Sequence, residues 1–187
     1  MKLAIPIAVL SLMSACAANS PGRVTSAEGL PGTDGALHTL LPPRADAYTV
    51  VIFFSPDCHV LAAHDDRIRK LAADFGPPRV RILGVDPEVD ASLERDRAEV
   101  ERRRYPFPVV IDRGGELARS LGATFAGYTV VLDHAGNARY RGGIDSDRVH
   151  LRDDATRYLA DALTDLLGGK APRVAESKAL GCALRLR

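Results

Sequence analysis

Three cysteines carry most of the chemistry that this sequence offers, and they lie far apart, at Cys16, Cys58 and Cys182. Cys58 follows a continuous apolar run, Tyr48–Phe54, across the short turn Ser55–Asp57, and it precedes a segment whose apolar residues have helical spacing. The free amides and the positive dipole end of a helix N-terminus favour a thiolate. The sequence therefore predicts that Cys58 is a reactive nucleophile, with a buried cysteine acting as a small apolar residue as the alternative.

The residues beside Cys58 act on its charge in opposite directions. A protonated His59 would stabilise a thiolate, whereas the carboxylate of Asp57 would oppose it by like-charge repulsion. Arg119, which follows a later strand, is a further candidate because a guanidinium could face an anionic substrate; an exposed helix charge is the alternative. We therefore name His59, Asp57 and Arg119 as supporting residues of a site built on Cys58.

Cys182 lies in the last stretch of the chain, 170–187, which has no strong periodicity. If Cys16 carries a lipid, Cys58 and Cys182 are the two cysteines left, the smallest number that can form an intramolecular bridge. They are 124 residues apart. In the chain-entropy model, closing so long a loop would give a disulfide worth about 4–5 kcal/mol. We expect the tail to fold back so that Cys182 resolves or caps Cys58; an unrelated cysteine on a frayed tail is the alternative.

The first fifteen residues read as an export signal, with Lys2 before the apolar run Leu3–Met13 and small residues before Cys16. The run is shorter than the roughly 20 residues that a spanning helix needs. The segment resembles a bacterial lipoprotein signal, although Met13 stands where leucine is usual, and a plain secretory signal is the alternative. We therefore expect an exported protein, periplasmic or anchored to the envelope, that contacts a membrane only through a lipid on Cys16.

Composition excludes several classes of protein. Of 187 residues, 46% are hydrophobic, which is enough for a packed core. Lys and Arg total 25 against 24 Asp and Glu, so no net positive field would gather nucleic acid. The basic run Arg102–Arg104 lies in a segment, 91–103, where acidic residues alternate with basic ones, so we expect a solvent-facing helix with internal ion pairs. No nucleic-acid partner is expected.

The body of the chain alternates strand-like and helix-like patterns. Strands are predicted over 48–54, 80–85, 107–111, 129–132 and 138–141, and helices over 60–75, 91–103, 116–121 and 153–167. This order predicts an α/β domain of three layers, with a central mixed β-sheet flanked by helices. The expected segments are a signal over 1–15, a tether over 16–44, the domain over 45–168 and a tail over 169–187.

Several stretches resemble one family. Phe53–Val60 looks like the active-site edge of thioredoxin-fold proteins, and Tyr105–Gly122 is similar to redoxins of the alkyl hydroperoxide reductase and thiol-specific antioxidant type. The hairpin Val130–Gly142 resembles the last two strands of that fold, and Gly169–Cys182 resembles the ending of a bacterial redoxin subgroup with a carboxyl-terminal cysteine. The resemblance implies a thioredoxin-like fold from Leu37 to Cys182.

The resemblance also assigns roles to single residues. Cys58 falls at the thioredoxin nucleophile and near the peroxidatic cysteine of the antioxidant enzymes, and Leu61 stands where a thioredoxin has its second cysteine. Ser55 matches the Thr or Ser that assists peroxide binding, so it would orient the substrate or hydrogen-bond the thiolate. Two positions depart from the family: Val51 replaces an expected proline, and Gly127 stands where the fold usually has a cis-proline facing the cysteine. The loss of the cis-proline at Gly127 removes a usual substrate-contact element.

Metal and cofactor motifs are absent from the sequence. His59 and His64 lie close to Cys58, but copper chaperones on this fold need a second cysteine at the position of Ala62. His64 falls on the apolar stripe of its segment, which is typical of a hydrogen-bonded core or edge histidine. No glycine-rich phosphate loop and no His-Glu-x-x-His motif occurs. We therefore expect neither a metal site nor a bound cofactor.

Two functions remain open. The first is an exported thiol redox enzyme, either a thiol-disulfide oxidoreductase or a peroxiredoxin-like antioxidant. Its Cys58 would attack a small thiol's disulfide, a protein disulfide or a peroxide, and an external reductant of unknown identity would restore it. The second is a non-catalytic thioredoxin-fold scaffold on the envelope, in which Cys58 and Cys182 form a permanent structural disulfide.

Overall fold

The computed structural model describes residue 24, residues 29–42 and residues 44–187. The predicted signal, with Cys16, lies outside the described residues. The strands are β1 (Leu30–Pro31), β2 (Leu37–His38), β3 (Tyr48–Phe53), β4 (Val80–Asp86), β5 (Val109–Ile111), β6 (Thr129–Leu132) and β7 (Ala138–Gly142). The helices are α1 (His59–Ala63), α2 (Asp65–Phe75), α3 (Leu93–Arg103), α4 (Glu116–Leu121) and α5 (Tyr158–Leu167).

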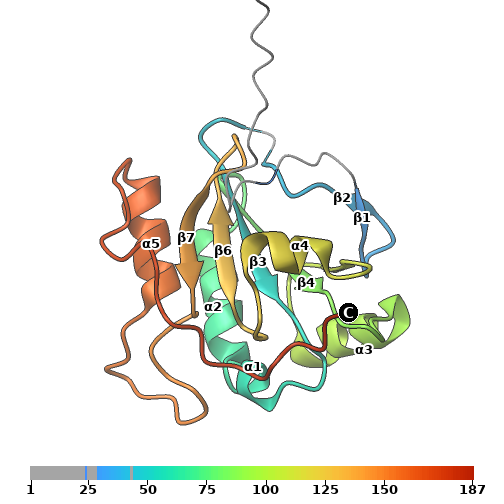
Figure 1. Ribbon diagram of the computed structural model, residues 1–187. Coiled ribbons are helices and arrows are strands. Elements are labelled where there is room, and N and C mark those ends of the chain that lie inside the picture. The colour runs from blue at the N-terminus through green and yellow to red at the C-terminus, as the bar shows by residue number, and fades with distance from the viewer. Residues whose placement is uncertain (1–23, 25–28, 43) are drawn as a thin grey trace, which may run out of the picture.

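The centre of the molecule is a five-stranded sheet with the order β5-β4-β3-β6-β7. Strands β3, β4 and β5 are parallel, whereas β6 and β7 run antiparallel to their neighbours. In Figure 1, α4 crosses in front of the sheet while α2 lies behind it, so the sheet is covered on both faces. The predicted three-layer α/β fold with a mixed sheet is confirmed.

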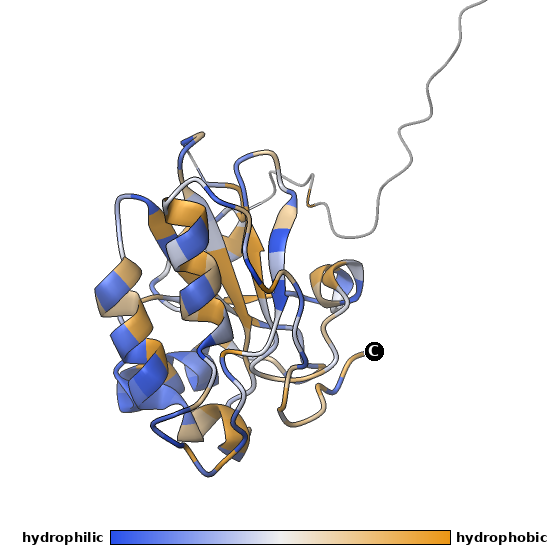
Figure 2. Cartoon of the chain, turned by 90° about the vertical axis from the view of Figure 1, so that its left-hand side faces the viewer, coloured by the Kyte–Doolittle hydropathy of each residue, from blue (hydrophilic) through white to orange (hydrophobic). Residues whose placement is uncertain are grey.

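Strand β3 explains why the apolar run of the sequence folds at the centre. Val50, Val51, Ile52, Phe53 and Phe54 are all buried, as expected for a strand with neighbours on both sides and helices on both faces. Figure 2 shows the same pattern: the central strands are largely hydrophobic, while the helices around them carry hydrophilic stripes. The carboxyl end of this strand leads directly to Cys58.

Two predicted helices differ from the structure. The helix predicted over 60–75 is divided at His64 into α1 and α2. The helix predicted from residue 153 begins only at Tyr158, because side chains in the preceding loop bind its backbone: Asp147 accepts from the amide of Arg152, and Ser146 accepts from the amide of Thr156. Such local side-chain bonds compete with helix formation.

Helix α3 is not the solvated helix that its charges predict. Arg102 is exposed and pairs with Glu99, as expected, but Asp96 and Arg103 are fully buried. Arg103 donates to the carbonyl of Pro56 over 2.9 Å and lies above the ring of Phe54. The alternating charges concealed a buried stripe, because the sequence pattern of charged residues is the same whether they face solvent or pack against the domain.

The tail after α5 has no helix of its own and crosses the carboxyl end of the sheet. Figure 1 shows it passing close to α1 before it ends near α3. It is bound through single bridges: Glu176 pairs with Arg141 at the end of β7, and Ala183 pairs antiparallel with Phe125. Among the described residues, no helix has the length and apolarity needed to cross a membrane.

Candidate active site

Cys58 is placed where the sequence predicts, at the N-cap of α1. Its backbone is extended, and its sulfur accepts a hydrogen bond from the amide of Leu61 over 3.3 Å. Its own amide donates to the carbonyl of Ser55 over 3.2 Å, which closes the turn between β3 and α1. The side chain is nevertheless buried, with 1% of the residue exposed.

The tail is what covers Cys58. The amide of Cys182 donates to the Cys58 sulfur over 3.4 Å. On its other side, the carbonyl of Cys182 accepts from the amide of Ala126 over 2.9 Å, and the amide of Leu184 donates to the carbonyl of Thr124 over 2.9 Å. The tail is thus paired like a short antiparallel strand with the loop before β6, and this pairing sets Cys182 over Cys58.

Gly181 lets the tail approach this closely. A Cβ at that position would lie 1.9 Å from the carbonyl oxygen of Ala126, so any side chain there would force the two segments apart. The glycine before Cys182 is therefore a packing requirement of the site.

Both cysteines are free thiols in this structure, and they face each other. Cys182 is half-buried, and its sulfur lies 3.8 Å from Nδ1 of His59. The expected meeting of the tail with Cys58 therefore occurs, in a dithiol form. His59 contacts the sulfur of Cys182 and not that of Cys58.

The charge state of Cys58 differs from the expected one. Burial raises the pKa of its thiol, and the neighbouring Cys182 thiol raises it further, whereas the amides of Leu61 and Cys182 lower it. The amide at the helix N-terminus therefore favours the thiolate as predicted, but burial outweighs it, and the net shift of the Cys58 pKa is upward in this closed form. The reason is that removal of the sulfur from water disfavours its charged form more than two amides favour it.

Ser55 does not direct its hydroxyl to the thiol. The hydroxyl donates to Oε2 of Glu88 over 3.1 Å, and Glu88 also binds Arg185 in the tail, with Nη2 of Arg185 2.7 Å from the same oxygen. The amide of Arg185 donates to Oε1 of Glu88 over 3.2 Å. Buried Glu88 thus ties the turn before Cys58 to the segment after Cys182.

The other predicted residues lie around this centre or away from it. Asp57 is exposed and pairs with Arg95, so its carboxylate is occupied away from the sulfur. Arg119 donates to the carbonyls of Gly114 and Arg187, at the chain end and not at either cysteine. Gly127 has φ +83°, and its amide donates to the carbonyl of Phe53 over 2.7 Å.

Ala126, just before Gly127, makes a backbone contact with the tail although this loop lacks the cis-proline of the family. Its amide binds the Cys182 carbonyl, so a backbone group of this loop still contacts an extended segment opposite Cys58. Sequence analysis missed Ala126 and Glu88. The only sequence signal for Glu88 as a site residue is its position just after the end of a buried strand and Pro87. No sequence feature indicates that the amide of Ala126 contacts the tail.

Two further carboxyl groups, those of Asp86 and Asp96, are buried near Glu88. In the described part of the chain, Oδ2 of Asp86 and both carboxyl oxygens of Asp96 have no hydrogen-bond partner. Burial, together with the adjacent Asp86 carboxyl, raises the pKa of Asp96 to about 8. Burial likewise raises the pKa of Asp86 to about 6. The pair is therefore at least partly protonated at neutral pH.

His64 behaves as the predicted core histidine. Its Nδ1 lies 2.8 Å from the carbonyl of Val60, and its Nε2 lies 3.2 Å from Oδ1 of Asp145. Arg67 binds the other oxygen of Asp145 over 2.6 Å. The histidine thus fixes α1 to the loop after β7. No three His, Cys, Asp or Glu side chains within the described ranges are grouped as a metal site requires.

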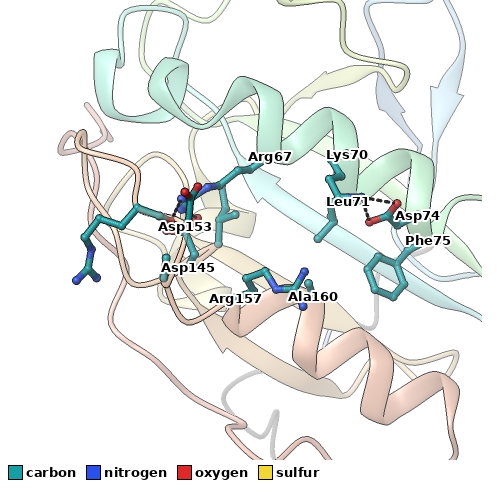
Figure 3. Close-up of a pocket in the computed structure, with 12 residues that line it drawn as sticks. Arg67, Lys70, Leu71, Asp74, Phe75, Asp145, Asp153, Arg157 and Ala160 are labelled. Atoms are coloured by element: carbon teal, nitrogen blue, oxygen red, sulfur yellow. Dashed lines mark hydrogen bonds and ion pairs between the residues drawn. The ribbon is translucent and has the colours of Figure 1, made fainter.

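A separate cavity of about 220 Å³ opens between α2 and α5 (Figure 3). Leu71, Phe75 and Ala160 form part of its apolar wall, and Lys70 at its edge pairs with Asp74. None of the residues predicted for the redox site lines it. The cavity and the cysteine pair are therefore distinct features.

Comparisons with known proteins agree with this architecture. The family model for the AhpC/TSA family matches residues 29–141. Among curated proteins, nothing matches the chain. An uncharacterized conserved protein from Geobacillus kaustophilus superposes with a TM-score of 0.78 at 23% identity, over 89% of this chain and 93% of that one.

Two more distant structures share the fold. A thioredoxin-like protein from Aeropyrum pernix has a TM-score of 0.53 at 17% identity, over 63% of this chain and 81% of that one. A thiol-disulfide oxidoreductase from Bacteroides fragilis has a TM-score of 0.52 at 16% identity, over 60% and 85%. At these identities the likeness establishes the thioredoxin-like fold.

Proposed function

This chain belongs to the AhpC/TSA family, and we propose that it is a thiol-disulfide redox protein in which Cys58 and Cys182 form one two-electron couple. The observation that carries the proposal is the contact between the two cysteines. The amide of Cys182 lies 3.4 Å from the Cys58 sulfur, and the two thiols face each other. Thiols held this way can close to a disulfide with a small movement of the tail.

The proposed reaction transfers two electrons to a substrate disulfide. The dithiol form gives two protons and two electrons to the substrate, whose S–S bond breaks to two thiols, and the Cys58–Cys182 S–S bond forms. An external dithiol or thiol reductant then restores the protein by the reverse exchange. No cofactor is needed for this cycle because sulfur carries the electrons throughout.

A disulfide substrate fits the site better than a peroxide. The Ser55 hydroxyl, which would assist peroxide binding, donates to Glu88, and Arg119 donates to the carbonyls of Gly114 and Arg187. We therefore place disulfides of small thiols or of proteins ahead of peroxides as substrates.

We further propose that the protein acts outside the cytosol. The support is the apolar run Leu3–Met13 after Lys2, followed by Cys16 in a lipoprotein-like context. An oxidising compartment would allow the Cys58–Cys182 couple to cycle through its disulfide form. A lipid on Cys16 would then be the only membrane contact.

A non-catalytic scaffold with a structural disulfide is the second candidate. The observation that favours it is the burial of Cys58, since a sulfur with 1% exposure reacts only when the tail moves. The two proposals differ in whether the disulfide is reversible at physiological potentials. A structural disulfide resists reduction by a glutathione pool, whereas a catalytic one exchanges with it.

The deciding experiment equilibrates the full chain in glutathione buffers of graded potential and measures the Cys58–Cys182 disulfide by non-reducing peptide mass spectrometry. Reversible formation, together with turnover of a disulfide substrate that is lost in Cys58→Ser and in Cys182→Ser, supports the redox proposal. Cys16→Ser is the matched control and should keep both properties. A disulfide that no glutathione ratio reduces, with no turnover, would establish the scaffold instead.

A further inference from the structure

We propose that Cys182, and not Cys58, is the sulfur that first attacks an external disulfide, with His59 accepting its proton and Cys58 completing the reaction. This assignment rests on the proposed function and reverses the order that the position of Cys58 at a helix N-terminus suggests. It makes His59 a catalytic residue for the first step.

Access to solvent separates the two sulfurs. Thiol–disulfide exchange needs an open approach to the attacking sulfur along the line of the bond that breaks. Cys58 is 1% exposed, and the backbone of the tail lies directly against its sulfur. Cys182 is half-buried, and its sulfur contacts the exposed side chain of His59. In the closed form, a substrate therefore meets Cys182 first.

The pairing of the tail with the loop before β6 keeps this arrangement in place. Ala126 and Thr124 bind the backbone on either side of Cys182 through two hydrogen bonds of 2.9 Å. The tail therefore need not detach for the first step, since Cys182 is already accessible while its main chain is held. An initial attack by Cys58 would first require these bonds to break.

His59 stands where a proton acceptor for Cys182 is needed. Its Nδ1 lies 3.8 Å from the Cys182 sulfur, within the range of a hydrogen bond to sulfur. It is an exposed residue at the start of α1, so it can exchange a proton with water after the step. In the neutral imidazole one ring nitrogen is free to accept the thiol proton.

The two steps balance. The Cys182 thiol transfers its proton to His59, its sulfur bonds to one sulfur of the substrate disulfide, and the other substrate sulfur leaves as a thiolate that takes up a proton. Cys58 then attacks the Cys182 sulfur, and the bond between Cys182 and the substrate sulfur breaks. The departing thiolate takes up the Cys58 proton, which releases the second substrate thiol and closes the Cys58–Cys182 disulfide.

The amides around Cys58 suit this second role. As negative charge develops on its sulfur, the amides of Leu61 and Cys182 already point at it, at 3.3 and 3.4 Å. Preorganised donors of this kind stabilise charge as it appears in the transition state. A buried sulfur that reacts only with the adjacent Cys182 is also protected from side reactions with other oxidants.

The test uses the full chain with Cys16→Ser, reduced and then mixed with 5,5′-dithiobis(2-nitrobenzoate) as the disulfide. The Cys58→Ser variant should react at a rate close to that of the first phase of the parent, and peptide mass spectrometry should find the thionitrobenzoate on Cys182. The Cys182→Ser variant should react at least about tenfold more slowly, because its sulfur becomes accessible only by local opening.

Histidine variants test the proton acceptor. In the Cys58→Ser background, His59→Asn should slow the reaction of Cys182 and move its pH–rate profile to higher pH. The matched control His134→Asn, a change in an exposed turn, should alter neither. An unchanged pH–rate profile for His59→Asn would remove His59 from the mechanism.

The outcomes separate this inference from the proposed function. If the parent releases two thionitrobenzoates and ends as the Cys58–Cys182 disulfide, but Cys182→Ser reacts as fast as Cys58→Ser with the label on Cys58, the order proposed here is overturned and the redox couple remains. If the parent forms no such disulfide with this reagent, the redox couple itself is overturned.

Discussion

The two cysteines of the site are held by regions of opposite character. Cys58 stands on a turn between β3 and α1, and this turn is anchored to the core by Arg103, whose guanidinium binds the Pro56 carbonyl. Cys182 stands on a tail without regular structure. Backbone hydrogen bonds to Thr124, Ala126 and Val89 hold this part of the tail, together with the side chain of Arg185 on Glu88. One sulfur is positioned by the global fold, and the other by a segment that can open locally.

Because of this difference, the global stability of the protein and the accessibility of the Cys58 sulfur should respond to different substitutions. Substitutions on the Cys58 side should lower the free energy of global unfolding, because the turn cannot loosen without the core. Substitutions in the tail should expose Cys58 to reagents while global unfolding changes little. The four predictions below test that separation, from the largest expected effect to the smallest.

Replacement of Arg103 by methionine should give the largest loss of stability. Its side chain is 1% exposed and binds Glu99, Asp65 and the Pro56 carbonyl. Loss of a buried, hydrogen-bonded charge destabilises by about 3–5 kcal/mol. Urea unfolding should measure this decrease. The neighbouring Arg102→Met is the control, and it should have no measurable effect because Arg102 is exposed. Equal stability of the two variants would contradict the buried role of Arg103.

Replacement of Asp96 by asparagine should stabilise the protein at alkaline pH. Burial raises the pKa of this carboxyl from 3.8 to about 8, so the native state holds a proton that the unfolded state releases. The free energy of unfolding therefore falls as pH rises from about 4 to about 8. Asparagine resembles the protonated acid and removes this loss, which grows by about 3–4 kcal/mol between pH 5 and pH 8.

The measurement for Asp96 is the unfolding free energy at pH 5 and at pH 8. The gain of Asp96→Asn should be small at the lower pH and large at the higher one. Asp86, Glu88 and Arg95 face this carboxyl and remain in both proteins. Glu94→Gln, on the same helix but exposed, is the control and should leave the pH dependence unchanged. An equal gain at both pH values would show that ionisation is not the cause.

Replacement of Gly181 by alanine should open the tail. The added Cβ would lie 1.9 Å from the Ala126 carbonyl oxygen, so the segment must move away. Loss of two backbone hydrogen bonds, at about 1 kcal/mol each, should speed alkylation of Cys58 by about thirtyfold. Iodoacetamide labelling followed by peptide mass spectrometry measures the rate. Ala183→Gly is the matched control in the same segment. Unchanged labelling of Cys58 would mean that the tail is not its cover.

Replacement of Arg185 by glutamine should have the smallest effect. Arg185 binds Glu88 and Asp90 but is half-exposed, so water screens much of the attraction. We expect labelling of Cys58 to accelerate roughly two- to fivefold, and less so in high salt. Arg187→Gln is the control, since Arg187 contacts Arg119 only through its carbonyl. A similar acceleration in both variants would indicate a general effect of charge on the tail.

The sequence predicted the sheet and the position of Cys58 because both depend on local patterns. The apolar run that became β3, the turn after it and the helical spacing after Cys58 all lie within a single stretch of chain. The number of cysteines left beside Cys16, together with a tail that lacks periodicity, led to the expectation that Cys182 returns to Cys58, and the structure brings the two together. The helix predicted from residue 153 failed because Asp147 and Ser146 bind the backbone that would have begun it.

Local pattern thus determined which residue ends the central strand and caps the next helix, since strand and helix propensities are properties of neighbours in the chain. The tertiary structure decided everything that depends on contacts between distant segments: that the tail buries Cys58, that its thiol is therefore harder to ionise, and that His59 contacts Cys182. The physical reason is that the charge and reactivity of a thiol depend on the water and the donors around it. A segment 124 residues away supplies one of the two amides at the Cys58 sulfur and the neighbouring thiol.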